Sequence, residues 1–108
     1  DFIQERSDAF KKRRNFVVKS LNNIKGISCL TPNGAFYVFP SCKQLLGRKT
    51  KLKTDSDFVE KLLEKASVAV VQGSAFGLDG YFRISYATSM EKLKVAMERI
   101  KSFCESLS

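Results

Sequence analysis

The 108-residue sequence contains no histidine, and this absence restricts the chemistry that the chain performs by itself. A Ser-His-Asp or Cys-His catalytic arrangement is excluded within these residues. Most zinc sites need histidine or clustered cysteine, and no two of the cysteines, Cys29, Cys42 and Cys104, lie at metal-ligand spacing. We therefore expect no catalytic residue and no metal site in this chain, and reduced cysteines, as in a cytoplasmic protein.

Long apolar runs are also absent, and none approaches the roughly 20 residues that a membrane-spanning helix requires. No signal-peptide pattern opens the chain, so we expect no membrane partner. The hydrophobic share of 44% and the charged share of 28% are typical of a globular protein, and 108 residues suit one domain. Because the chain begins at Asp1 without methionine and enters an amphipathic pattern at once, we interpret it as a fragment of a longer protein.

The net charge of +8, from 19 basic and 11 acidic residues, raises the alternative of a nucleic-acid-binding module. In that case Phe36, Tyr37 and Phe39 would stack on bases. However, the order of the predicted elements is not that of an RNA-recognition motif, and the basic segment 48–53 contains no aromatic residue. The basic run 11–14 lies opposite an apolar stripe, which favours a solvated helix face. We expect no nucleic-acid partner, and salt-dependent RNA binding would contradict this expectation.

Apolar residues at helical spacing predict three helices. The first spans residues 2–24. The second spans Thr54–Ala66, with the threonine as N-cap and Asp57 completing a weaker form of the capping box. The third begins after Thr88, which we predict to be the N-cap of a full capping box with Glu91, and it continues nearly to the end of the chain.

Short apolar or aromatic runs between these helices predict β-strands. Turn residues at 31–34 separate the first two strands, a helical turn is expected within 41–47, and an exposed loop over 48–53. The element order is helix, two strands, helix, two strands, helix. It predicts an α+β fold, in which a small sheet of about four short strands is covered by helices on one side. The predicted strands are 27–30, 35–39, 67–71 and 81–86.

Arg83 is the residue most indicative of function, because it lies in the middle of an aromatic-rich strand. A charge there is costly unless it is paired. The guanidinium group meets a carboxylate with two parallel hydrogen bonds, and a strand holds such a group rigidly. The pattern leaves two further interpretations open: an ion pair with an acid such as Asp79 or Glu60, or an exposed sheet face.

The segment before this strand, residues 72–80, contains three glycines and invites comparison with phosphate-binding loops. It fits neither the dinucleotide-binding fingerprint nor the P-loop, because Gly77 and Gly80 are spaced wrongly and no Gly-Lys-Ser/Thr follows. The sequence favours a tight structural connection instead.

Several stretches together resemble class I aminotransferases of the aspartate type. Residues 33–40, NGAFYVFP, resemble the GAFY strand of that family, and residues 68–77, VAVVQGSAFG, resemble its VAVVPGSAFG segment. Residues 81–87, YFRISYA, resemble its RISYA strand. The opening and closing helices fit the same family, so the resemblance covers nearly the whole chain in the right order.

The resemblance implies a fold type I enzyme that depends on pyridoxal 5'-phosphate. In such enzymes a large domain holds the cofactor, a small C-terminal domain closes over the substrate, and two subunits form a homodimer. Residues 1–108 are then one domain, the small domain of a cytoplasmic aminotransferase with amino acid and 2-oxo acid substrates, aspartate and 2-oxoglutarate above all. Arg83 matches the arginine that binds the substrate α-carboxylate, and bidentate pairing would fix the substrate for reaction.

The same resemblance shows what the chain lacks. No segment matches the cofactor lysine, and Lys61 and Lys65 do not occupy a Schiff-base position. The acidic partner of the pyridine nitrogen and the ring stacked on the cofactor also belong to the large domain. We expect the fragment alone to bind no cofactor and to be inactive. Gln72 stands where the family usually has proline, which we expect to loosen the loop leading to Phe76. Other fold type I enzymes, such as decarboxylases and lyases, remain an alternative.

Overall fold

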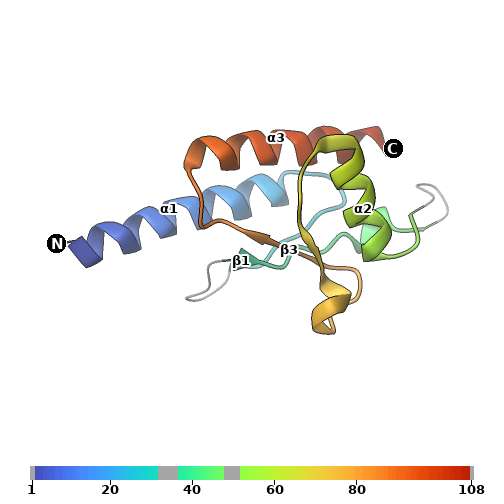
Figure 1. Ribbon diagram of the computed structural model, residues 1–108, viewed down its shortest axis with the longest axis horizontal. Helices are drawn as coiled ribbons and strands as arrows, with labels where there is room; N and C mark the ends of the chain where they lie inside the picture. Colours follow the sequence, from blue (N-terminus) through green and yellow to red (C-terminus); the bar gives the residue numbers. More distant parts are fainter. Residues whose placement is uncertain (1, 32–36, 48–51, 108) are drawn as a thin grey trace.

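The computed structural model describes the backbone of residues 2–31, 37–47 and 52–107, with side chains from residue 8 onward. Among these residues helices and short strands alternate along the chain (Figure 1). The elements are α1 (Phe2–Asn22), β1 (Tyr37–Val38), the 3-10 turn η1 (Lys43–Leu45), α2 (Asp55–Ala66), β2 (Val71–Gln72), the 3-10 turn η2 (Gly73–Phe76), β3 (Phe82–Ser85) and α3 (Met90–Ser106).

The strands form a three-stranded antiparallel sheet in the order β1-β3-β2, with β3 in the centre. Tyr37 pairs with Ser85 on one side of β3, and Val71 pairs with Arg83 on the other. Figure 1 shows α1 and α3 side by side along one side of this sheet, and α2 packs against α3. The predicted α+β architecture is confirmed.

The core lies between the sheet and these helices. Phe82 and Ile84 of β3 are buried on the same face as Val38 of β1, which is paired with Ile84. The ring of Phe58 on α2 lies 5.1 Å from that of Phe82 and 5.6 Å from that of Phe103 on α3. Burial of each side chain of this size stabilises the fold by about 1.5–3 kcal/mol, so the contact among these rings holds β3 against both helices.

Helix α2 begins as the sequence predicts. Thr54 accepts a hydrogen bond from the backbone N–H of Asp57, and the Asp57 carboxylate accepts one from the backbone N–H of Thr54. The helix ends at Ala66 and is capped by Ser67, whose φ of 58° is left-handed. Because the chain turns at Ser67, the strand predicted over 67–71 starts only at Val71, the first residue of β2.

Helix α3 begins one residue later than predicted. Its N-cap is Ser89, whose hydroxyl accepts a hydrogen bond from the Lys92 N–H at 3.2 Å. The prediction that Thr88 caps this helix together with Glu91 is therefore wrong. Both residues are good N-caps, and only the chain path out of β3 decides between two adjacent candidates.

Residues 27–30 do not form the predicted strand beyond a single bridge between Ser28 and Ser41. The side-chain amide of Asn22 explains this, because it donates to the Cys29 carbonyl and accepts from the Cys29 N–H, both at 2.8 Å. A side chain therefore occupies the groups that a neighbouring strand would use.

The remaining loop predictions have mixed outcomes. Leu52 is 4% exposed, so the prediction that residues 48–53 form an exposed loop is wrong at this position, and residues 48–51 lie outside the described residues. Residues 32–36, which contain most of the predicted turn and the start of the predicted second strand, also lie outside them. No helix within the described ranges is long and apolar enough to cross a membrane.

Candidate carboxylate-binding site around Arg83

Strand β3 directs Arg83 away from the core. Phe82 and Ile84, on either side of it, are buried against the helices, so the alternation of a strand sends Arg83 to the opposite face of the sheet. We call this the outer face. Arg83 is paired with Val71 of β2, and the two residues after it in β3 are paired with β1, so the strand is held on both sides. The side chain itself is half-buried.

Aromatic rings surround the Arg83 guanidinium on the outer face. Its central carbon lies 4.8 Å from the ring centroid of Phe76 and 5.1 Å from that of Tyr37. Both distances are within the range in which a cation is attracted to the face of a ring. Phe39 lies 5.6 Å from each of these rings and nearly perpendicular to both, so it braces them. We call Tyr37, Phe39 and Phe76 the aromatic cluster.

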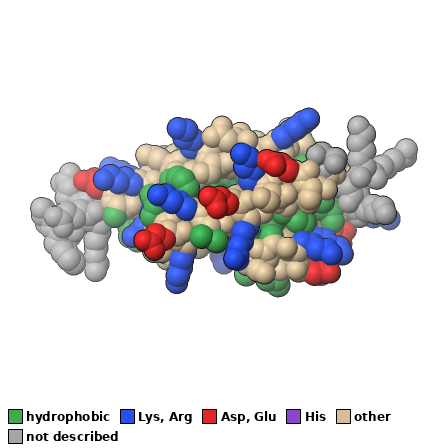
Figure 2. Space-filling view, turned by 90° about the horizontal axis from the view of Figure 1, so that it is seen from above, with side chains coloured by type: hydrophobic (Ala, Val, Ile, Leu, Met, Phe, Trp, Pro, Cys, Tyr) green, Lys and Arg blue, Asp and Glu red, His purple; other side chains and the backbone are tan. Residues whose placement is uncertain are grey.

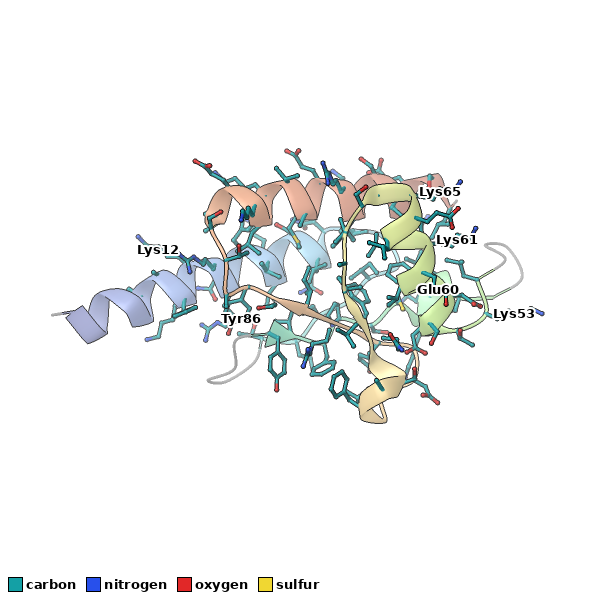
Figure 3. The ribbon with its side chains drawn as sticks, in the orientation of Figure 1. Lys12, Lys53, Glu60, Lys61, Lys65 and Tyr86 are labelled. Atoms are coloured by element: carbon teal, nitrogen blue, oxygen red, sulfur yellow. The ribbon has the colours of Figure 1, made fainter. Side chains whose placement is uncertain are left out.

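No carboxylate neutralises Arg83 within the described part of the chain. The ion pair found there joins Lys61 and Glu64 at 3.5 Å on the exposed surface of α2. Glu60 is also exposed on α2, as Figure 3 shows, and neither it nor Asp79 forms an ion pair with Arg83. The ion-pair interpretation of Arg83 is therefore not realised among these residues. Within the described ranges no hydrogen bond to another residue occupies its N–H donors, which could therefore bind a ligand.

The loop that carries Phe76 is fixed by a buried acid. Asp55, at the start of α2, is 3% exposed, and its carboxylate accepts a hydrogen bond from the backbone N–H of Ser74 at 2.7 Å. Burial acts to raise the pKa of Asp55, but hydrogen bonds from the backbone and side chain of Ser74, together with backbone N–H groups including that of Gly80, outweigh it and lower the pKa overall. The acid is therefore ionised at neutral pH, and it ties η2 to α2.

Several backbone N–H groups of this loop already have partners in the loop or in the adjacent strand. The N–H of Gly73 donates to Tyr81, that of Gly77 to Ser74 and that of Leu78 back to Gly73, at 2.7, 3.2 and 2.9 Å. A Cβ atom at Gly73 would collide with the carbonyl oxygens of Leu78 and Tyr81, which explains the glycine there. These amides are not available to a phosphate group, so the loop is a tight connection, in line with the sequence.

The side chains that a covalent or cofactor-binding role would need do not converge on Arg83. Every lysine whose side chain the structure describes is exposed. Burial raises the pKa of the thiols of Cys29 to about 11, and of Cys42 and Cys104 to about 12, so they are neutral at pH 7. The described residues hold no cluster that could bind a metal ion. Among the described residues, therefore, neither a reactive nucleophile nor a metal-ligand cluster accompanies Arg83.

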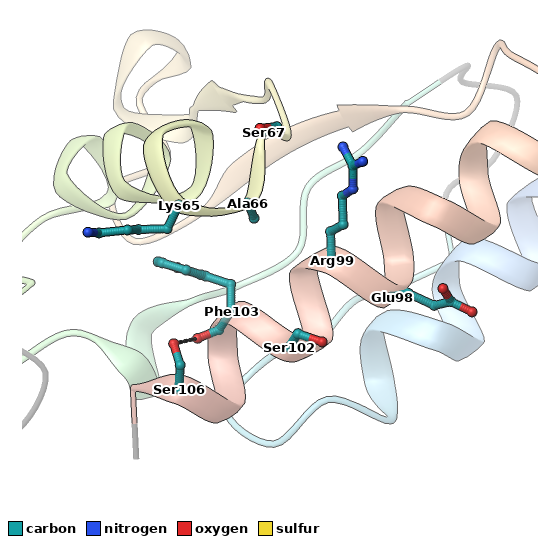
Figure 4. A pocket seen from close by; sticks show the side chains of 8 residues that line it. All are labelled: Lys65, Ala66, Ser67, Glu98, Arg99, Ser102, Phe103 and Ser106. Carbon is teal, nitrogen blue, oxygen red and sulfur yellow. Dashed lines mark hydrogen bonds between the residues drawn. The ribbon is translucent and has the colours of Figure 1, made fainter.

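The helical side of the molecule offers a less favourable surface for a carboxylate. A hollow between α2 and α3 contains Arg99, whose guanidinium points toward Ser67, but Glu98 also lines it and Lys65 points away (Figure 4). Figure 2 shows basic and acidic side chains interspersed over the surface seen from above. Positive charge on that surface is therefore not concentrated at one site.

The sequence singled out Arg83 as a candidate but did not predict which residues surround it. A signal for Tyr37 and Phe39 exists in the period of two along their strand, which places both on one face. Phe76 and Asp55 carry no such signal, because their roles depend on contacts between segments distant in the sequence.

Comparison with known proteins identifies the family of this chain. The profile of the family described as aminotransferase class I and II matches residues 1–100. Aspartate aminotransferase from Rhizobium meliloti strain 1021 is 54% identical over 112 residues, covering 100% of this chain. A probable aspartate/prephenate aminotransferase from Rhizobium leguminosarum bv. phaseoli is 56% identical over 108 residues, covering 96% of this chain. The chain spans 27% of the length of either relative.

Solved structures give the same result. The crystal structure of the Rhizobium meliloti aspartate aminotransferase superposes with a TM-score of 0.96 at 54% identity, covering 100% of this chain and 28% of that one. Alanine aminotransferase from Pyrococcus furiosus superposes with a TM-score of 0.88 at 38% identity, covering 98% of this chain and 26% of that one. Enzymes of this family use pyridoxal phosphate, and the match over nearly all residues confirms the predicted resemblance. The chain belongs to the class I and II aminotransferases, of which it represents about a quarter of the usual length.

Proposed function

We propose that residues 1–108 are the C-terminal small domain of a pyridoxal-phosphate-dependent aminotransferase, and that Arg83 binds the α-carboxylate of its substrate. The observation that carries the proposal is a half-buried guanidinium, surrounded by rings, without an acidic partner among the described residues. A half-buried cation without an acidic partner is stabilised by an anionic ligand, and the planar guanidinium forms two parallel hydrogen bonds with a carboxylate.

The chemistry that follows from this geometry is positioning. Two parallel hydrogen bonds would fix both the location and the rotation of the carboxylate, and hence the direction of the Cα–H bond of the amino acid. The aromatic cluster would exclude water from the pair and strengthen it. Pyridoxal phosphate, held by residues outside this chain, supplies the electron sink for amino transfer when it is bound. We assign no covalent bond with the substrate to any described residue of this chain.

The proposed substrates are aspartate and 2-oxoglutarate, because relatives at 54% and 52% identity are named aspartate aminotransferase. Prephenate is a second candidate acceptor, since the name of the Rhizobium leguminosarum relative includes it. The full-length protein is proposed to act as a cytoplasmic homodimer in which this domain closes on the large domain of the same chain. Family membership favours this function over the nucleic-acid-binding alternative.

The test is an assay of amino transfer by the full-length protein that contains this chain. With pyridoxal phosphate present, aspartate should be converted when 2-oxoglutarate is the acceptor, and prephenate is tested in parallel. The purified 108 residues, assayed in the same way, should show no transfer. A full-length protein that is folded and loaded but converts neither acceptor would overturn the proposed substrates, and activity of the fragment would overturn the assignment of chemistry to the large domain.

A further inference from the structure

We propose that Phe76 and Tyr37 are positioning residues that hold the Arg83 guanidinium in place for the substrate carboxylate. The inference rests on the proposed function, since it explains how Arg83 stays ready to bind. It assigns a role to the aromatic cluster, which is partly solvent-exposed: Phe76 is 47% exposed and Tyr37 is 39% exposed.

The need for such residues follows from the contacts of Arg83. A long, flexible side chain loses considerable rotamer entropy when it is fixed, and within the described residues no ion pair fixes it. An acid in this position would hold the guanidinium but would also occupy the N–H donors that the substrate needs. Ring faces attract the cation without accepting those hydrogen bonds in the guanidinium plane, so they order the group and leave its donors free.

The two rings approach from opposite neighbours of β3 in the sheet. Tyr37 lies on β1, where it is opposite Ser85, and Phe76 ends η2, which follows β2 directly. Phe39 contacts both rings and closes the cluster. Because the rings are anchored on the elements that flank the central strand, movement of either element relative to β3 changes the position of the guanidinium.

Phe76 has its own support. The hydrogen bond from the Ser74 N–H to the buried Asp55 carboxylate holds η2, and the Leu78 N–H donates back to Gly73 at the start of the turn. The support on the side of Tyr37 is the pairing of β1 with β3. The position of each ring is therefore set by backbone geometry rather than by contact with a substrate.

The experiment compares full-length holoenzyme variants by the dissociation constant of succinate, an unreactive dicarboxylate, and by kcat and KM for aspartate. Phe76→Leu should weaken succinate binding about 3- to 30-fold, the range expected for one cation–π contact, and should raise KM more than it lowers kcat. Tyr37→Leu should act in the same direction. Phe76→Tyr and Tyr37→Phe keep a ring and should remain within about twofold of wild type.

A double-mutant cycle separates positioning from a general structural effect. In an Arg83→Leu background, Phe76→Leu should change kcat/KM by less than about twofold, since there is no guanidinium left to position. Leu63→Ala, which truncates a side chain on α2 that is 54% exposed, is the matched control. It should leave the dissociation constant of succinate and kcat/KM for aspartate unchanged. Thermal unfolding of each variant verifies that it is folded.

The outcomes distinguish this inference from the function on which it rests. If Arg83→Leu does not weaken succinate binding, the proposed role of Arg83 is wrong and the positioning inference fails with it. If Arg83→Leu abolishes binding while Phe76→Leu and Tyr37→Leu leave it unchanged, the inference alone is wrong. It is also wrong if the effect of Phe76→Leu is the same with and without Arg83.

Discussion

Asp55 shows how a single buried charge supports the site from a distance. It lies on a different element from Arg83, yet its carboxylate accepts the hydrogen bond that holds the turn carrying Phe76. Hydrogen bonds from backbone N–H groups lower its pKa although burial opposes ionisation. Removing the charge would leave the Ser74 N–H with a weaker acceptor in a buried place.

We expect Asp55→Asn to lower the free energy of unfolding by about 1–3 kcal/mol at pH 7. Because the folded-state pKa of Asp55 is lowered, its stabilisation is fully present above the unfolded value of about 3.9 and is lost as the pH falls through the folded pKa. The difference between wild type and variant should therefore shrink below about pH 4. Urea unfolding of the full-length protein at several pH values measures it, and a difference that is independent of pH would contradict the role of the charge.

Gln72 stands where the aminotransferase family usually has proline, and its backbone conformation shows what this difference means for the loop. Its φ of −63° is the value that proline imposes, so glutamine in this position does not change the path of the loop. Gly73 donates to Tyr81 across the strand pair, and by the alternation of the ladder the Gln72 N–H points away from β3. Proline would therefore remove no hydrogen bond to that strand.

We expect Gln72→Pro to be tolerated and to stabilise the protein by about 0.4–1 kcal/mol, because it restricts the unfolded chain. Thermal unfolding of the full-length pair, with and without the substitution, is the measurement. A destabilisation of more than about 1 kcal/mol would mean that the Gln72 N–H has a partner that matters.

At the scale of elements, two adjacent residues at the N-terminus of α3 are alternative N-caps. The hydroxyl of Ser89 accepts the hydrogen bond from Lys92, whereas the sequence pattern favours Thr88. We expect Ser89→Ala to cost about 0.5–2 kcal/mol of unfolding free energy, the usual effect of losing an N-cap.

Thr88→Ala is the matched control, one residue earlier, and should cost less than about 0.5 kcal/mol. Chemical denaturation of both variants gives the comparison. The reverse ranking would restore Thr88 as the cap and contradict the helix start described here.

The elements also show how far the sequence alone could lead. The helices were predictable because their apolar spacing and the Thr54 cap are local signals. The strands were overestimated in length, since Ser67 adopts a left-handed conformation and Asn22 satisfies the backbone of Cys29. Arg83 stood out because a charge interrupts an aromatic strand. The rings around it depend on strand register and on the Asp55 contact, which no local pattern specifies.

At the scale of the whole molecule, the sheet separates two different surfaces. Helices cover one face and bury the core (Figure 1). The other face carries Arg83 and the aromatic cluster. The chain spans about 27% of the length of its relatives. In the proposed full-length enzyme we expect the outer face to close on the large domain, which would bring the guanidinium to the cofactor-bound substrate.

The central claim is that Arg83 binds the substrate carboxylate, and substitution of this residue in the full-length enzyme tests it most directly. We expect Arg83→Leu to lower kcat/KM for aspartate roughly a thousandfold while the protein stays folded and retains pyridoxal phosphate. Arg83→Lys keeps the charge but loses the planar pair of donors, so its kcat/KM should lie between the values for wild type and Arg83→Leu. A leucine variant as active as wild type would contradict the account.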